Sequence, residues 1–227
     1  MSEYMRGIDV SHHNSESLIE DIISDREAGL DFLIAKATEG TSFTDKKFDS
    51  YMKMCAKNGV LRGAYHYVNA PTKLESGAFM GSEGEAYNFV SRVRPYGDTL
   101  LALDFEESKM LSQYGVEYLC NVAQYVKSMT GTPPLIYASE SVLRQFDFSM
   151  AQSIGCGVWV AKWGKNTPKN LFEVGWVFDK ASSCNFGVVA LQQISSKAVF
   201  NGNNINLDID IANMSKSAWA KYANPRL

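Results

Sequence analysis

Short apolar runs alternate with segments of helical periodicity along most of the 227-residue chain. In the segment VEYLCNVAQYVKSMTG, Leu119, Ala123 and Val126 recur at three- and four-residue spacing, which is typical of a buried helix face. The whole pattern predicts eight strands, at Gly7–Ser11, Phe32–Ala37, Arg62–Val68, Thr99–Phe105, Leu135–Ala138, Val158–Trp163, Val188–Ile194 and Leu207–Ile211. It predicts helices at Ser17–Ala28, Asp45–Asn58, Ser82–Arg94, Val116–Met129 and Ser215–Tyr222.

Alternation of strand and helix predicts parallel strand pairing with right-handed crossovers. Eight such strands predict an α/β fold, an irregular TIM-like β/α barrel with fewer helices in its second half. Residues 164–187 read as a long irregular excursion. No repeat, low-complexity tract or linker divides the chain, so we expect one domain over residues 1–227, with a core at 6–213 and a final helix at 215–222.

Composition narrows the class of protein further. The net charge is −3 and no Lys/Arg cluster is present, which argues against a nucleic-acid partner or an anionic membrane surface. No apolar run reaches the roughly 20 residues of a bilayer span, so we expect no membrane insertion. The N-terminal segment lacks the features of a signal peptide, which predicts synthesis in the cytoplasm. The four cysteines are far apart and favour reduced thiols rather than a metal cluster, although three disulfide connectivities stay open.

Two carboxylates end an apolar run in LALDFEES, residues 101–108. Asp104 and Glu106 are two positions apart on a predicted strand, so their side chains should share one face. Burying charge is costly, and chemistry in barrels gathers where strands end, which favours a functional role for this pair. Asp9 lies in a strand between two apolar residues, and NINLDIDIAN places Asp208 with Asp210 on one face. The pattern leaves open which of these last two acids points inward.

Aromatic residues accompany the acids at the predicted strand ends: Tyr65, Tyr67, Tyr137, Trp159 and Trp163. Flat rings at a cleft can stack on the apolar faces of sugars. The three histidines, His12, His13 and His66, lack metal-ligand spacing, and no nucleophile elbow is present, so we expect neither a metal nor a Ser or Cys nucleophile. Acids and aromatic rings in a barrel mouth, without metal ligands, best fit cleavage of a glycosidic bond.

Eight stretches in order, RGIDVSHHN, FLIAKATEGTSFTDKKF, GVLRGAYHYV, LALDFEE, PLIYAS, VWVAKW, LQQIS and LDIDIAN, resemble the family-25 glycoside hydrolases over residues 6–213. These are N-acetylmuramidases (lysozymes) found among phage endolysins and bacterial autolysins. The resemblance implies a barrel that cuts the β-1,4 bond between N-acetylmuramic acid and N-acetylglucosamine in peptidoglycan, with retention and without a cofactor. It implies Glu106 as general acid and Asp9, Asp104 and Asp208 as surrounding carboxylates. The sugar groove would be lined by Lys36, Glu39, Tyr65, Tyr137, Trp163 and Gln193.

The resemblance also bears on partners. We expect bacterial peptidoglycan as the substrate, a monomer, no separate wall-binding domain, and export through a partner such as a holin. One alternative is a catalytically weak or inactive module that binds wall carbohydrate. Another is a different barrel glycosidase, such as a chitinase of the D-x-x-D-x-D-x-E type, of which TLLALDFEE carries only the last acid pair.

Overall fold

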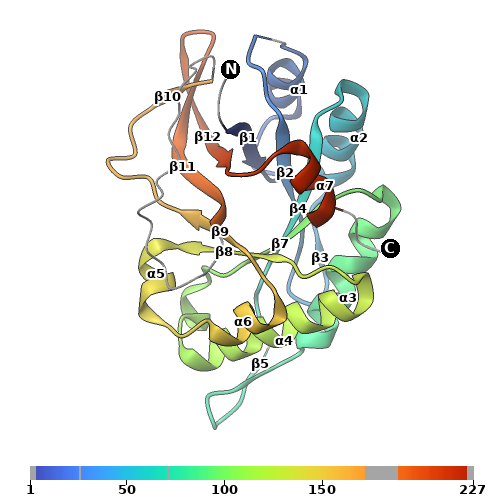
Figure 1. Cartoon of the computed structure of the whole chain (residues 1–227), viewed down its shortest axis with the longest axis vertical. Helices are drawn as coiled ribbons and strands as arrows, with labels where there is room; N and C mark the ends of the chain where they lie inside the picture. Colours follow the sequence, from blue (N-terminus) through green and yellow to red (C-terminus); the bar gives the residue numbers. More distant parts are fainter. Residues whose placement is uncertain (1–3, 26, 71, 172–188, 224–227) are drawn as a thin grey trace.

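The computed structural model describes residues 4–25, 27–70, 72–171 and 189–223. Within these, eight strands close into a barrel in the order β1-β12-β11-β9-β8-β7-β4-β2, and β2 pairs with β1 to complete the ring (Figure 1). The strands are β1 (Met5–Val10), β2 (Phe32–Glu39), β4 (Leu61–Tyr67), β7 (Leu100–Asp104), β8 (Leu135–Ser139), β9 (Val158–Ala161), β11 (Val189–Phe200) and β12 (Asn203–Ala212). All eight predicted strands are present, and the α/β barrel is confirmed.

The other described elements are helices, 3₁₀ turns and short strands that connect or cover the barrel strands. The helices are α1 (Glu16–Ser24), α2 (Phe48–Asn58), α3 (Ser82–Val93), α4 (Gln113–Thr130), α5 (Glu140–Gln145), α6 (Ser149–Ile154) and α7 (Lys216–Tyr222), with 3₁₀ turns at Arg94–Tyr96 and Ser108–Met110. Short strands β3 (Phe43–Thr44) and β10 (Lys169–Asn170) extend the sheet, while β5 (Thr72–Lys73) and β6 (Phe79–Met80) form a separate hairpin. The five predicted helices are confirmed, whereas α5 and α6 were missed because six residues are too few to show periodicity. Most of the 164–187 excursion lies outside the described residues.

The prediction of parallel pairing is wrong for β12, which runs antiparallel to both β1 and β11. Phe200 pairs with Asn203, so only Asn201 and Gly202 connect β11 to β12. Both residues have positive φ, 50° and 77°, as a tight hairpin turn requires. Two residues cannot form the crossover that a parallel pair needs. Both strands also extend well beyond the predicted segments and project from the ring as a ribbon (Figure 1).

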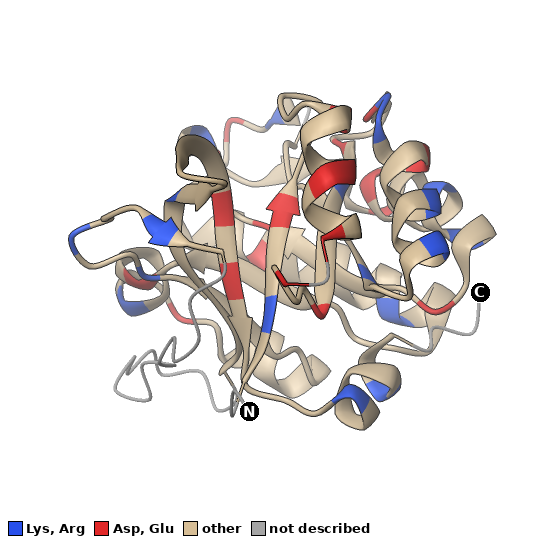
Figure 2. Ribbon diagram, turned by 90° about the horizontal axis from the view of Figure 1, so that it is seen from above, with Lys and Arg blue, Asp and Glu red and all other residues tan. Residues whose placement is uncertain are grey.

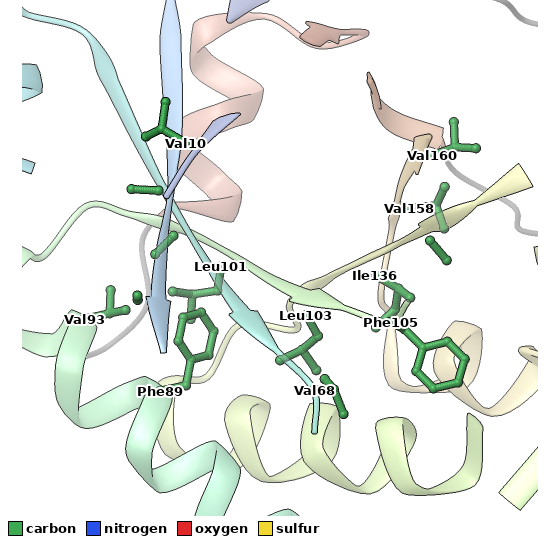
Figure 3. Close-up of a cluster of buried hydrophobic side chains, with 14 of the residues drawn as sticks. Val10, Val68, Phe89, Val93, Leu101, Leu103, Phe105, Ile136, Val158 and Val160 are labelled. Carbon is green, nitrogen blue, oxygen red and sulfur yellow. The ribbon is translucent and has the colours of Figure 1, made fainter. Parts of the chain in front are cut away.

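Two apolar layers hold the barrel together. One lies between the strands and the surrounding helices, where Val10, Leu103 and Phe105 contribute side chains (Figure 3). The second fills the barrel itself, where the ring of Phe32 lies 4.9 Å from that of Trp219 on α7. Alternation along each strand sends successive side chains to different layers, so Asp9 points away from the helices that its neighbours contact.

The inner apolar layer requires glycine at two strand positions as well as large side chains elsewhere. A Cβ at Gly7 would lie 2.2 Å from the ring of Phe32, and one at Gly63 would lie 2.8 Å from Ile34. These two glycines therefore make room for the apolar floor of the barrel, on which the polar mouth rests.

Three cysteines, Cys55, Cys120 and Cys156, are free and buried, in agreement with reduced thiols, and Cys184 lies outside the described residues. Burial raises the pKa of each of the three thiols, which keeps them protonated and inert. No helix among the described residues combines the length and apolarity that a bilayer span requires.

Candidate active site

A pocket of about 200 Å³ opens at the barrel mouth. Seven of the barrel strands, or the residues directly after them, supply its lining: Asp9, Tyr65, Asp104, Glu106, Tyr137, Trp159, Trp163, Gln193 and Asp208. Figure 2 shows acidic positions on several strands near the centre of the molecule, whereas many of the basic positions lie on the outer helices. Eight of the ten predicted site residues thus meet in one place. Trp159, which the sequence analysis counted only among the aromatic residues, also belongs to the lining.

Asp104 and Glu106 share the pocket but differ in their access to solvent. Asp104, the last residue of β7, is only 6% exposed, whereas Glu106 follows the strand and is exposed. The residue between them, Phe105, is fully buried in the layer under the helices. The alternation predicted for D-x-E is therefore realised, with one acid at the floor and the other at the mouth.

Their surroundings raise the pKa of both carboxyl groups. For Asp104 the main cause is burial, followed by the charge of Glu106, and Lys36 opposes both. For Glu106 the main cause is again desolvation; Lys36 opposes it and the charge of Glu107 adds to it. A raised pKa favours the protonated form near neutrality, which is the form a proton donor needs. The exposed member of the pair is the one that a substrate can reach.

Gln193 joins three lining residues into one network. Its Oε1 accepts hydrogen bonds from the Tyr137 hydroxyl at 2.9 Å and from Trp163 Nε1 at 2.8 Å. Its Nε2 donates to Asp9 Oδ2 at 2.8 Å. Two donors on the amide oxygen fix the orientation of the amide, and this in turn directs an N–H at Asp9. Gln193 is thus a support for Asp9 as well as part of the wall.

The reversed direction of β12 determines which of its acids lines the pocket. Asp208 is paired across the strands with Asp9, near the mouth, whereas Asp210 is opposite Gly7, one layer deeper. Asp208 lines the pocket, and burial together with the charge of Glu106 raises its pKa to about 6. Asp210 is fully buried and accepts a hydrogen bond from Trp159 Nε1 at 2.8 Å. The sequence left open whether Asp208 or Asp210 points inward. Both point inward, with Asp208 near the mouth and Asp210 one layer deeper in the barrel.

Lys36 and Glu39 lie outside the lining of this pocket. Lys36 Nζ is 2.7 Å from Glu39 Oε2, and Asn69 Nδ2 donates to the other oxygen of Glu39 at 3.1 Å. Lys36 Nζ also lies 4.7 Å from the centroid of the Tyr67 ring. Through its charge Lys36 lowers the pKa of Asp104 and of Glu106, so it acts on the acid pair from outside the pocket.

The histidines have structural partners. His66 is fully buried between Thr38 and Glu85, at 2.7 Å and 2.8 Å, and His12 Nδ1 lies 2.8 Å from Asp45 Oδ2. Among the residues that the structure describes, no group of three or more His, Cys, Asp or Glu side chains is arranged to hold a metal ion.

A closed α/β barrel with carboxylates and aromatic rings at its mouth is the architecture of barrel glycoside hydrolases. The sequence profile of glycosyl hydrolases family 25 matches residues 8–184, which is most of the chain. The chain belongs to this family.

Two relatives and one solved structure resemble the chain at 22–32% sequence identity. The chain is 26% identical over 174 residues to Lysozyme M1 of Streptomyces globisporus, covering 72% of this chain and 56% of that protein. It is 32% identical over 140 residues to the uncharacterized protein YegX of Escherichia coli (strain K12), covering 59% of this chain and 48% of that protein. The chain therefore spans about half the length of these two relatives. The fold is similar to that of the bacterial lysozyme from Streptomyces coelicolor, with a TM-score of 0.69 and 22% identity, covering 98% of both chains.

Proposed function

We propose that this chain is a peptidoglycan hydrolase that cleaves the β-1,4 bond between N-acetylmuramic acid and N-acetylglucosamine. The observation that carries the proposal is the convergence of Asp9, Asp104, Glu106 and Asp208 with aromatic side chains on one pocket at the barrel mouth. Membership of family 25 agrees with glycosidic chemistry. Two carboxyl groups on opposite sides of a bond are the usual machinery of such a reaction.

In this proposal Glu106 is the general acid. Its raised pKa favours the protonated form that a general acid needs, and its exposed carboxyl group can approach the leaving sugar oxygen. As the glycosidic bond breaks, the proton of Glu106 passes to that oxygen. The carbonyl oxygen of the substrate's own N-acetyl group bonds to the anomeric carbon from the face opposite the leaving group and inverts its configuration. Water then opens this cyclic intermediate, and the Glu106 carboxylate takes the proton from the water. Attack by water inverts the configuration a second time, so the product retains the original configuration.

The other carboxylates stabilise the positive charge that develops on the sugar. Asp208, with a pKa raised to about 6, is ionised at neutral pH and faces the same space. Asp9 is held by Gln193 and adds to the negative potential of the pocket floor. Trp163, which is 40% exposed, offers a flat surface for a sugar ring at the rim. All of these groups come from one chain, so we propose a monomer as the active form.

The test is digestion of purified peptidoglycan followed by mass spectrometry of the products. We expect fragments with muramic acid at the reducing end, and release at least about 100-fold slower by Glu106→Gln. Reducing-end glucosamine would indicate a glucosaminidase, and new free amino groups on intact glycan would indicate an amidase or peptidase. Binding without any release would instead support the wall-binding alternative.

We propose that the protein reaches the wall through a holin. Lysis of cells with and without a co-expressed holin tests this proposal separately.

A further inference from the structure

Asp210 has a buried carboxyl group outside the pocket lining. It is 0% exposed and lies on β12 opposite Gly7 of β1. Its Oδ1 accepts a hydrogen bond from Trp159 Nε1 at 2.8 Å. Its Oδ2 is buried and receives no donor from the described residues. Burial of an ionised carboxylate with half of its acceptors unmet is costly, so this group needs a second partner.

That partner is Asp9. Asp9 lies beside Asp210 in the β1–β12 register, because Asp9 pairs with Asp208 and Gly7 pairs with Asp210, and each of the two carboxyl groups shifts the pKa of the other as a hydrogen-bond partner. Asp9 Oδ2 also accepts from Gln193 Nε2 at 2.8 Å. An ionised carboxylate has only acceptors, so two of them can form a hydrogen bond only if one carries a proton. Both side chains are buried, Asp9 at 7% exposure, which favours the state with one charge over the state with two.

Burial and the nearby negative charge favour that retained proton, whereas the donors Gln193 and Trp159 stabilise the single charge that remains on the pair. Asp208 on β12 is the nearby carboxylate whose charge acts on both members, and burial raises the pKa of each member further. From β4 and β8, Tyr65 and Tyr137 face Asp9 as neutral phenols, because burial raises their pKa. The partners on β9 and β11, Trp159 and Gln193, carry no charge. The Lys36 cation is paired with Glu39.

We propose that Asp9 and Asp210 share a single proton, and that Asp210 is the positioning residue that holds the Asp9 carboxylate in the pocket. The pair then places one negative charge, not two, beneath the substrate site. Asp9 is fixed by the Gln193 amide, which donates to its Oδ2, and by the proton that it shares with Asp210. The kinetic consequences rest on the proposed function, whereas the proton sharing is a property of the folded chain alone.

The substitution Asp210→Asn tests the proposal directly. The amide oxygen can still accept from Trp159, and its N–H₂ group can donate to Asp9 without any titrating proton. Asp210→Ala removes the donor altogether. We expect kcat/KM of Asp210→Asn within about threefold of the parent, and a loss of about tenfold to hundredfold for Asp210→Ala, as for one hydrogen bond to a charged group.

The pH dependence of the free energy of unfolding is the second measurement. A carboxyl group whose pKa is raised by folding stabilises the native state below its unfolded pKa, near about 3.9, and that stability is lost as pH rises toward the folded pKa. The parent should therefore lose stability with rising pH relative to Asp210→Asn, by up to about tenfold in the folding equilibrium constant per pH unit. The exposed Glu117→Gln, which removes a charge on α4, should show no such slope.

The measurements are urea unfolding of the parent, Asp210→Asn and Glu117→Gln between pH 4 and pH 9, and peptidoglycan turnover of the parent, Asp210→Asn and Asp210→Ala. A stability difference that does not change with pH overturns the shared proton. Equal turnover losses in Asp210→Asn and Asp210→Ala overturn the positioning role. A parent without turnover at any pH refutes the proposed function, and the unfolding data still decide the proton sharing. If Asp210→Asn does not fold, Asp9→Asn removes the same proton from the other side and must give the same pH slope.

Discussion

Replacement of Glu106 by Gln is the most direct test of the site. Gln keeps the size of the side chain and its position at the mouth but carries no proton for the leaving oxygen. The other acid of the pair, Asp104, is only 6% exposed at the pocket floor, so it does not have the access to the leaving oxygen that Glu106 has. General acid catalysis contributes roughly 10²–10⁴-fold to a rate. We therefore expect a loss of at least about 100-fold in kcat, or about 3 kcal/mol of transition-state stabilisation.

Glu107→Gln is the matched control, because it neutralises the next carboxylate along the chain. The charge of Glu107 raises the pKa of Glu106, whereas the charge of Lys36 lowers it. Activity requires protonated Glu106, so it is lost as pH rises through that pKa. Glu107→Gln should move this alkaline limb to lower pH, and Lys36→Met should move it to higher pH. Both proteins should retain turnover that Glu106→Gln lacks.

The assay is release of reducing ends from purified peptidoglycan, measured as kcat/KM across the pH range. Circular dichroism of each variant controls for folding. Turnover of Glu106→Gln within threefold of the parent would remove Glu106 as the acid. Movement of the alkaline limb in the same direction by Glu107→Gln and Lys36→Met would show that another group sets it.

Four further outcomes are expected. Activity should survive exhaustive EDTA treatment, since no metal-binding group is present among the described residues, and loss that zinc or magnesium restores would contradict this. Trp163→Ala should raise KM more than it lowers kcat, because the exposed ring contributes binding in ground and transition states alike; a selective fall in kcat would contradict it. Because Asp208 acts ionised and its pKa is about 6, activity should fall as pH drops through about 6, and Asp208→Asn should abolish that limb. Gly7→Ala should lower the free energy of unfolding, measured with urea, by about 3 kcal/mol, because its Cβ would overlap the buried ring of Phe32. The control Gly84→Ala, on the exposed face of α3, should change the free energy of unfolding by less than about 1 kcal/mol.

The sequence was sufficient to predict the strands and most of the pocket. Apolar alternation locates a strand and assigns its faces, so it placed Asp104 and Glu106 on one face and set Asp9 opposite its apolar neighbours. The rule that barrel chemistry gathers at strand ends then brought them together. Alternation left open which of Asp208 and Asp210 points inward, and the inclusion of Asp208 in the site came from the family resemblance. The resemblance to family-25 glycoside hydrolases supplied the full set of ten site residues, of which eight line the pocket.

Strand direction could not be predicted from alternation, since a strand has the same pattern in either direction. The signal was nevertheless present, because Asn201-Gly202 between two apolar strands is typical of a tight hairpin. Neglect of that turn left the depths of Asp208 and Asp210 undetermined. The position of Lys36 depends on its ion pair with Glu39, and the role of Gln193 depends on contacts with residues far away in sequence. Neither has a local signature.

The pairing of β12 with β1 also bears on protein synthesis. The ribosome delivers β1 first and β12 last of the eight strands, and residue 9 meets residue 208 only across this final seam. Contacts between segments so distant along the chain form slowly and late. A nascent polypeptide therefore exposes an open sheet edge throughout translation and has no pocket. Termination upstream of β12 leaves a chain that cannot close its ring, so complete translation is a precondition for the site to exist.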